Sequence, residues 1–214
     1  MTEATHIEVL SALEDAGAWV MTHPVGNVAG RSRRRAVKRA LHSDAERILY
    51  SDLDHVIRWI ERDRNELEAL ISRTDAADLV IVGRSDAAFT RSPARLRDTE
   101  ALVNRVYKLL TGLDADLLFA IRLLTRQAAE AIVRECTEDT MSSDVEWPIV
   151  AEQRGLSVEY VAAEGLDYRT TADFDQSADG LDLDPQAWIY RVELAAQHVR
   201  VMQRLMSGRP DKGA

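Results

Sequence analysis

The distribution of apolar residues predicts that helices and strands alternate along the chain. Segments with the helical spacing of apolar residues fall at 3–16, 31–41, 55–73, 98–111, 126–136 and 185–206. Short apolar runs of strand length fall at 18–23, 47–51, 78–83 and 156–164. The repeated helix-then-strand order indicates an α/β domain, with a mainly parallel sheet flanked by helices.

The pattern shows no internal repeat that would divide the chain. We therefore expect residues 1–207 to form a single domain. Within it, the acidic, glycine-containing run 170–184 is typical of a mobile loop, and residues 208–214 are expected to be a flexible tail.

The composition of the chain excludes some classes of binding partner and indicates its cellular compartment. The chain has 214 residues, with 36 Asp and Glu against 27 Lys and Arg, and its net charge of −9 argues against a nucleic-acid or anionic-membrane binder. The single cysteine, Cys136, excludes an intramolecular disulfide and a cysteine-based zinc cluster. Because we see neither a signal peptide nor an apolar run of about 18 residues, we expect a cytoplasmic protein without a transmembrane segment. A homo-oligomer remains open.

Two aspartates follow the apolar strand pattern at residues 47–51. Ligands of open α/β sheets gather outside the carboxyl ends of strands, where Asp52 and Asp54 would stand. Two carboxylates at this spacing can share a hard divalent cation that water and phosphate oxygens complete. The alternative is structural, with Asp54 capping the helix that starts near His55 and Asp52 solvated.

A run of arginines at the start of a predicted helix is a second candidate for ligand binding. Arg31, Arg33, Arg34 and Arg35 oppose the helix macrodipole there, which favours an anionic ligand such as a diphosphate. Four neighbouring helical residues cannot all face one site, so the others would be solvated or paired with acids. Replacing Arg33 and Arg34 by Ala is expected to weaken diphosphate binding with little effect on stability. Arg84, after the strand pattern at 78–83, is either a further ligand contact or a solvated charge.

The order of these motifs resembles that of a known enzyme family. The chain carries HPVGN (23–27), GRSRRRAVKRAL (30–41), RILYSDLDH (47–55), ADLVIVGRS (77–85) and SSDVEWPIVAEQRGLSVEYVAAEGLDYR (142–169). In this order they resemble the middle of a family 2 glycosyltransferase domain of the GT-A fold, the group that includes dolichyl-phosphate mannose synthase. The resemblance covers roughly residues 15–170.

The resemblance implies specific roles for the acidic residues. Asp52 and Asp54 match the family's Asp-x-Asp motif, which implies contacts to Mg²⁺ or Mn²⁺ and to a nucleotide sugar. Asp144 stands where the family places the base that deprotonates the acceptor hydroxyl, with Glu146 as the second choice. Alternatively, SSDVEW only opens and caps a helix.

The sequence departs from the family at its start. Members begin with a strand, a helix and a second strand that hold the nucleotide base, and nothing here matches them, so we expect an amino-terminally shortened GT-A-like domain. The segment DLLFAIR also lacks the family's Ser-Gly. The resemblance implies metal-dependent transfer of a hexose from a nucleotide sugar to a hydroxyl acceptor.

Two other functions remain open. One is a catalytically degenerate domain that binds a nucleotide sugar or a protein without turnover. The other is a phosphatase with Asp52 as nucleophile and Asp54 as acid/base, although the sequence lacks clear Thr/Ser and Lys partners for that chemistry.

Overall fold

The computed structural model describes residues 1–23, 25–26, 28–73, 76–168 and 180–207, and within them it contains one four-stranded sheet with helices around it. The strands are β1 (Arg47–Ser51), β2 (Leu79–Arg84), β3 (Ile121–Thr125) and β4 (Val158–Ala163). The helices are α1 (Ile7–Asp15), α2 (Ala29–Ala40), α3 (Leu53–Ile71), α4 (Asp86–Thr90), α5 (Ala94–Thr111), α6 (Arg126–Glu135), α7 (Ser143–Gln153) and α8 (Pro185–Ser207), with a 3₁₀ helix η2 (Gly180–Leu183) before α8.

The sheet has the strand order β1-β3-β2-β4 and mixed direction. Strand β2 pairs with β4 in parallel, whereas β3 runs antiparallel to both of its neighbours, β1 and β2. The predicted α/β class is confirmed. The sheet is mixed instead of mainly parallel, because β3, which was not among the predicted strands, makes two of the three strand pairings antiparallel. Ser51 and Val82 both lie opposite Ile121. The carboxyl ends of β1 and β2 therefore meet the start of β3 at one edge of the sheet.

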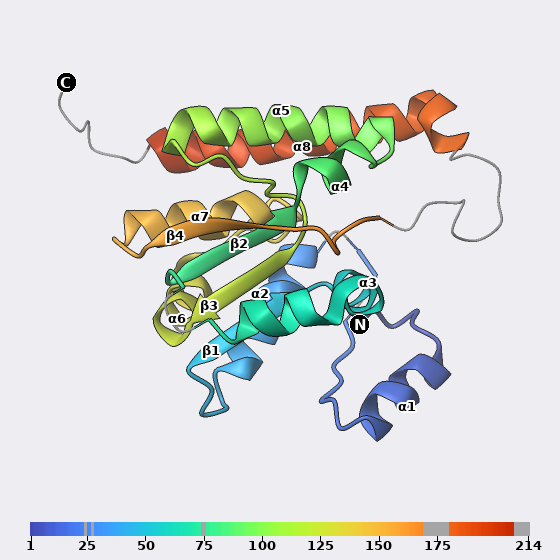
Figure 1. Ribbon diagram of the computed structural model, residues 1–214, viewed down its shortest axis with the longest axis vertical. Coiled ribbons are helices and arrows are strands. Elements are labelled where there is room, and N and C mark those ends of the chain that lie inside the picture. Colours follow the sequence, from blue (N-terminus) through green and yellow to red (C-terminus); the bar gives the residue numbers. More distant parts are fainter. Residues whose placement is uncertain (24, 27, 74–75, 169–179, 208–214) are drawn as a thin grey trace.

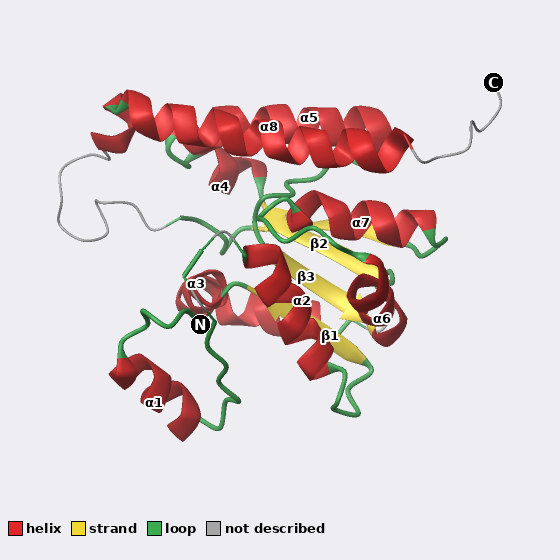
Figure 2. Cartoon of the chain, turned by 180° about the vertical axis from the view of Figure 1, so that it is seen from behind, coloured by secondary structure: helices red, strands yellow, loops and turns green. Residues whose placement is uncertain are grey.

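Helices cover both faces of the sheet (Figures 1 and 2). Leu79 and Ile81 of β2 belong to a core shared with α2, α6 and α7, whereas Val80 and Val82 belong to a second core under α3. All six residues of β2 are buried. Burial on both faces explains why this strand is an unbroken apolar run instead of an alternating one.

The predicted helices are confirmed with shifts of a few residues at their ends, but one predicted strand is wrong. Residues 18–23 form no strand, apart from an isolated bridge between Thr2 and His23. Trp19 and Met21 instead line an apolar pocket against α2. The segment therefore lies against a helix outside the sheet, and Trp19 stays 58% exposed there.

Two other features bear on the predicted organisation. Most of the expected loop at 170–184 and the expected tail lie outside the described residues, although Gly180–Leu183 form η2. Helices α5 and α8 lie side by side beyond β4 (Figure 1). None of the helices in the described part of the chain is both long and apolar enough to cross a bilayer.

Candidate functional site

A cavity of about 320 Å³ opens at the edge of the sheet where β1 ends. Residues from the end of β1, the first half of α2 and the start of α7 form one side, and residues of α5 and α8 form the other. We call this cavity the cleft. Its ionisable side chains are Arg33, Asp52, Asp54, His55, Glu100, Asp144, Tyr168, Tyr190, Arg191 and His198.

Arg33 connects the two acidic motifs that the sequence analysis singled out. Its guanidinium is buried and donates from Nη2 to Asp52 Oδ2 at 2.7 Å and from Nη1 to Asp144 Oδ1 at 2.8 Å. Burial alone would lower the pKa of Arg33, but the negative charge of Asp144, with those of its other neighbours, keeps it well above its ordinary value. The charged form of Arg33 thus holds two carboxylates that are 92 residues apart in sequence on one side of the cleft.

The position of α2 depends on a close approach to the loop before α7. Gly30 N donates to Asp139 O at 2.8 Å, and a Cβ on Gly30 would lie 2.6 Å from Thr140 O. Arg31 and Arg34 both bind the Asp139 carboxylate, with Arg31 Nε at 3.0 Å and Arg34 Nη2 at 2.6 Å. Among the arginines at this helix start, Arg33 is therefore the one that lines the cleft, while these two pair with an acid of the chain.

Asp52 is held on both of its oxygens. Tyr50 donates its hydroxyl to Asp52 Oδ1, while Arg33 occupies Oδ2. Burial raises the pKa of Asp52, but the neighbouring Arg33 charge and these hydrogen bonds outweigh it, so the pKa is lowered and the carboxylate stays ionised.

The capping interpretation of the Asp-x-Asp motif is wrong. Asp52, not Asp54, occupies the N-cap position of α3, and its side chain makes no capping hydrogen bond. Asp54 lies in the first turn, with 81% of its side chain exposed. One half-buried and one solvent-facing carboxylate therefore stand together in the cleft.

These carboxylates fit a cation that arrives with its ligand better than a resident metal. The described residues contain no group of three or more His, Cys, Asp or Glu side chains placed to hold an ion. A carboxylate has about four lone-pair sites, so Asp52 keeps acceptor capacity beside Tyr50 and Arg33. Mg²⁺ usually keeps several waters and takes one or two carboxylates together with substrate phosphates. Asp52 and Asp54 match that requirement.

Asp144 and Glu146 are two residues apart but have different surroundings. Asp144 Oδ1 faces Arg33, with Arg122 at 4.0 Å, and no described residue donates to Oδ2. Glu146 is buried and accepts hydrogen bonds from Thr137 N at 2.8 Å and from the next backbone N–H, and it does not line the cleft. Burial raises the pKa of Glu146. Asp144 is thus open to a ligand, whereas Glu146 holds the loop before α7.

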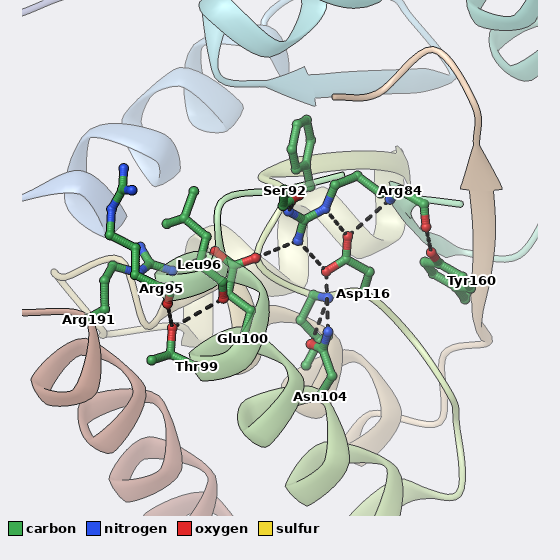
Figure 3. A network of polar contacts seen from close by, with 12 residues as sticks. Arg84, Ser92, Arg95, Leu96, Thr99, Glu100, Asn104, Asp116, Tyr160 and Arg191 are labelled. Atoms are coloured by element: carbon green, nitrogen blue, oxygen red, sulfur yellow. Dashed lines mark hydrogen bonds and ion pairs between the residues drawn. The ribbon is translucent and has the colours of Figure 1, made fainter. Parts of the chain in front are cut away.

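Arg84 lies in a buried polar network behind the cleft wall (Figure 3). Its guanidinium donates to Asp116 through Nε at 2.7 Å, to Ser92 at 2.9 Å and to Glu100. The second carboxylate oxygen of Glu100 accepts from Arg191 of α8. The hydrogen bonds of this network, which joins β2, α5 and α8, therefore occupy the Arg84 guanidinium. Arg84 is not among the residues that line the cleft.

Three further residues lie in this region, and none of them was among the site residues predicted from the sequence. Arg122, a lone charge in an apolar run, is buried and donates to the backbone oxygens of residues 117, 119, 121 and 144. His55 stacks on Phe119 with ring centroids 4.0 Å apart. His198 is buried in α8. A histidine in a helical stripe with Leu194 and Met202 was the available signal for His198.

Comparisons with known proteins address the fold. No model of a protein family matches the sequence, and no curated protein matches it. Among solved structures, the chain is similar to glucosyl-3-phosphoglycerate synthase from Mycobacterium tuberculosis, crystallised in complex with phosphoglyceric acid, with a TM-score of 0.51 and 13% sequence identity. The match covers 99% of this chain and 68% of that chain. The likeness to dolichyl-phosphate mannose synthase in particular stays a prediction. The likeness shows the fold alone, which is GT-A-like as predicted.

Proposed function

We propose that the chain is a glycosyltransferase that moves a hexose from a nucleotide sugar to a hydroxyl acceptor with the help of Mg²⁺ or Mn²⁺. The observation that carries this proposal is Arg33, which holds Asp52 and Asp144 in one cleft at the ligand-binding edge of a GT-A-type sheet. Ligands of open α/β sheets bind at this edge. A salt-bridge cluster with only a structural role would not need a cavity beside it.

The donor side of the cleft is assigned to Asp52 and Asp54. These carboxylates would hold the cation together with the diphosphate of the donor, and a bound cation supplies neutralisation of the charge that develops on the leaving nucleotide. Arg33 acts differently from the sequence expectation. Because its charge is matched by two carboxylates, it orients these acids and does not serve as a free phosphate-binding cation.

The acceptor side is assigned to Asp144. Its Oδ2 receives no hydrogen bond from a described residue, while Arg33 fixes Oδ1 and hence the orientation of the carboxylate. A fixed carboxylate with one open oxygen can take the proton of an acceptor hydroxyl as the glycosidic bond forms. Glu146 is left out of this assignment because its carboxylate is occupied by backbone N–H groups.

A binding domain without turnover is the second candidate. It is favoured by the hydrogen bonds that Asp52 already accepts from Tyr50 and Arg33, since a cation must compete with both. In that case the cleft would bind a nucleotide sugar without transferring the hexose.

A transfer assay separates the two candidates. The chain is incubated with UDP-, GDP- and ADP-linked hexoses, Mn²⁺ or Mg²⁺, and acceptors that include glycerol and phosphoglyceric acid, and the glycosylated product is measured. Asp144→Asn keeps an oxygen for Arg33 but removes the base, so we expect about a 10²–10⁴-fold loss of rate with donor affinity little changed. Asp44→Asn, at an exposed loop residue, is the control for the same change in charge. Donor binding without any product would support the binding domain instead.

A further inference from the structure

His198 has an unused ring nitrogen in the acceptor half of the cleft. The residue lies on α8, on the wall opposite the carboxyl end of β1, and its side chain is 1% exposed. Its Nδ1 lies 2.7 Å from Leu194 O, one turn earlier in the same helix. Its Nε2 is buried without a hydrogen-bond partner in the described part of the chain. A buried nitrogen without a hydrogen-bond partner lowers the stability of the fold unless a ligand or a water molecule hydrogen-bonds to it.

The hydrogen bond to Leu194 determines what Nε2 can do. A carbonyl oxygen only accepts, so Nδ1 must carry the hydrogen, and in a neutral imidazole Nε2 is then left with a lone pair. Burial lowers the pKa of His198, although the negative charge of Asp144 opposes this, so the neutral form is favoured. Arg191 and Arg33 are the cations that face the ring and also disfavour its protonation.

The lone pair on His198 Nε2 determines which ligand groups can bind to it. A nitrogen that only accepts hydrogen bonds pairs with O–H or N–H donors, whereas ionised phosphate and carboxylate oxygens have no hydrogen to donate. Asp144, on the facing side, also lines the cleft, and its Oδ2 accepts no hydrogen bond from a described residue. The cleft thus offers two acceptors to a molecule with more than one hydroxyl.

We propose that His198 is a positioning residue whose Nε2 accepts a hydrogen bond from a hydroxyl group of the acceptor, beside the hydroxyl that Asp144 deprotonates. The inference rests on the proposed function for the identity of that ligand as an acceptor. It narrows the acceptor to a molecule with at least two hydroxyl groups. The proton of this second hydroxyl stays on its oxygen, because the group only orients the acceptor.

Nuclear magnetic resonance of protein labelled with ¹⁵N-histidine tests the site without requiring turnover. We expect long-range ¹H–¹⁵N spectra at pH 8 to show His198 with hydrogen on Nδ1 and a lone pair on Nε2. Adding glycerol should shift the Nε2 resonance, and its trimethyl ether, which has the same skeleton but no O–H, should not. Hydrogen on Nε2, equal shifts with both probes, or no shift with glycerol would overturn the inference.

Two variants test the role in the reaction. His198→Phe removes the acceptor atom, whereas His198→Gln can present an amide oxygen near the same place. We expect His198→Phe to raise the KM for a polyol acceptor about tenfold with the KM for the donor unchanged, and His198→Gln to recover most of this loss. A purely structural role would instead lower the melting temperature and kcat of both variants, with no selective change in acceptor KM. If no transfer is found but glycerol still shifts Nε2, the proposed function fails and the hydroxyl site stands.

Discussion

Arg33 and Asp52 form a salt bridge with 2.7 Å between Nη2 and Oδ2, although one residue lies on α2 and the other directly after β1. The Arg33 side chain is buried, so the ion pair is poorly screened by solvent. A buried ion pair adds little to the stability of the fold compared with apolar side chains packed in its place. Removing one partner lowers the stability strongly, because the other charge then stays buried without its partner. The arrangement is therefore better explained by the orientation of the acids than by stability.

The first prediction concerns the loss of this cation. Arg33→Ala removes the cation that Asp52 and Asp144 share, so the free energy of unfolding should fall by about 3–5 kcal/mol. This replaces the sequence-based expectation that stability would change little. Lys38→Ala, at an exposed position of the same helix, should change it by only about 0.5 kcal/mol. Urea unfolding measures both, and equal effects would contradict the central role of Arg33.

The second prediction concerns the contact that positions α2. Gly30→Ala places a Cβ 2.6 Å from Thr140 O, and the backbone must move to relieve it. We expect destabilisation of about 1–3 kcal/mol, together with weaker ligand binding as Arg33 shifts. Gly26→Ala is the matched control because a Cβ there meets no atom within 4 Å. Thermal unfolding of the two variants measures the difference. Similar melting temperatures would contradict the proposal that the close approach at Gly30 positions α2.

The third prediction is a pH dependence of stability from His198. Burial lowers its pKa in the folded state, so between that value and the ordinary value of about 6.5 the unfolded chain binds the proton and the folded chain does not. The contribution of His198 is fully present above about pH 6.5, and is lost as the pH falls toward the folded-state pKa, with a slope of at most about 1.4 kcal/mol per pH unit.

Urea unfolding between pH 5 and pH 8 measures this slope. His198→Gln should remove the contribution of one titrating group and flatten the dependence, and His42→Gln, at an exposed histidine outside the cleft, is the control for the same substitution. An unaltered slope in His198→Gln would show that the ring is not held neutral by the fold.

The elements that could be predicted from the sequence are those whose own residues show a clear apolar pattern. The unbroken apolar run of β2 and the acids after β1 could be placed because strand length and strand order determine which edge they reach. The position of segment 18–23 could not be predicted, because apolar residues that line a pocket against a helix have the same composition as a strand. Strand β3 was missed because its charged residue, Arg122, is satisfied by backbone oxygens that only the fold supplies.

The candidate site was predictable in its parts but not in its connections. Asp52 and Asp144 were singled out by motif order, but their connection depends on Arg33, which lies 111 positions from Asp144 in the sequence. Asp144 and Glu146 share one helix start, and the sequence could not tell which would face the cleft. That choice depends on the loop before α7, whose N–H groups occupy Glu146.

The fourth prediction concerns the cation alone. Because the assigned cation ligands are two carboxylates, Asp52 and Asp54, and Asp52 is already hydrogen-bonded, Mn²⁺ without nucleotide should bind weakly. UDP should strengthen its binding by supplying phosphate oxygens. Water-proton relaxation of Mn²⁺ solutions, with and without UDP, measures this. Tight Mn²⁺ binding in the absence of nucleotide would point to a preformed metal site instead.

The central claim is that the carboxylates after β1 bind a nucleotide sugar through a divalent cation. Isothermal titration calorimetry of the chain with nucleotide sugars, with and without Mn²⁺, tests it most directly. The Mn²⁺-dependent affinity should disappear in Asp54→Asn, where the exposed side chain keeps the cost to the fold small, and in the double variant Asp52→Asn with Asp54→Asn. Asp44→Asn, with the same change in charge, should retain it. Mn²⁺-dependent affinity that survives in the folded double variant, or no affinity of the unaltered chain for any nucleotide sugar, would contradict the account.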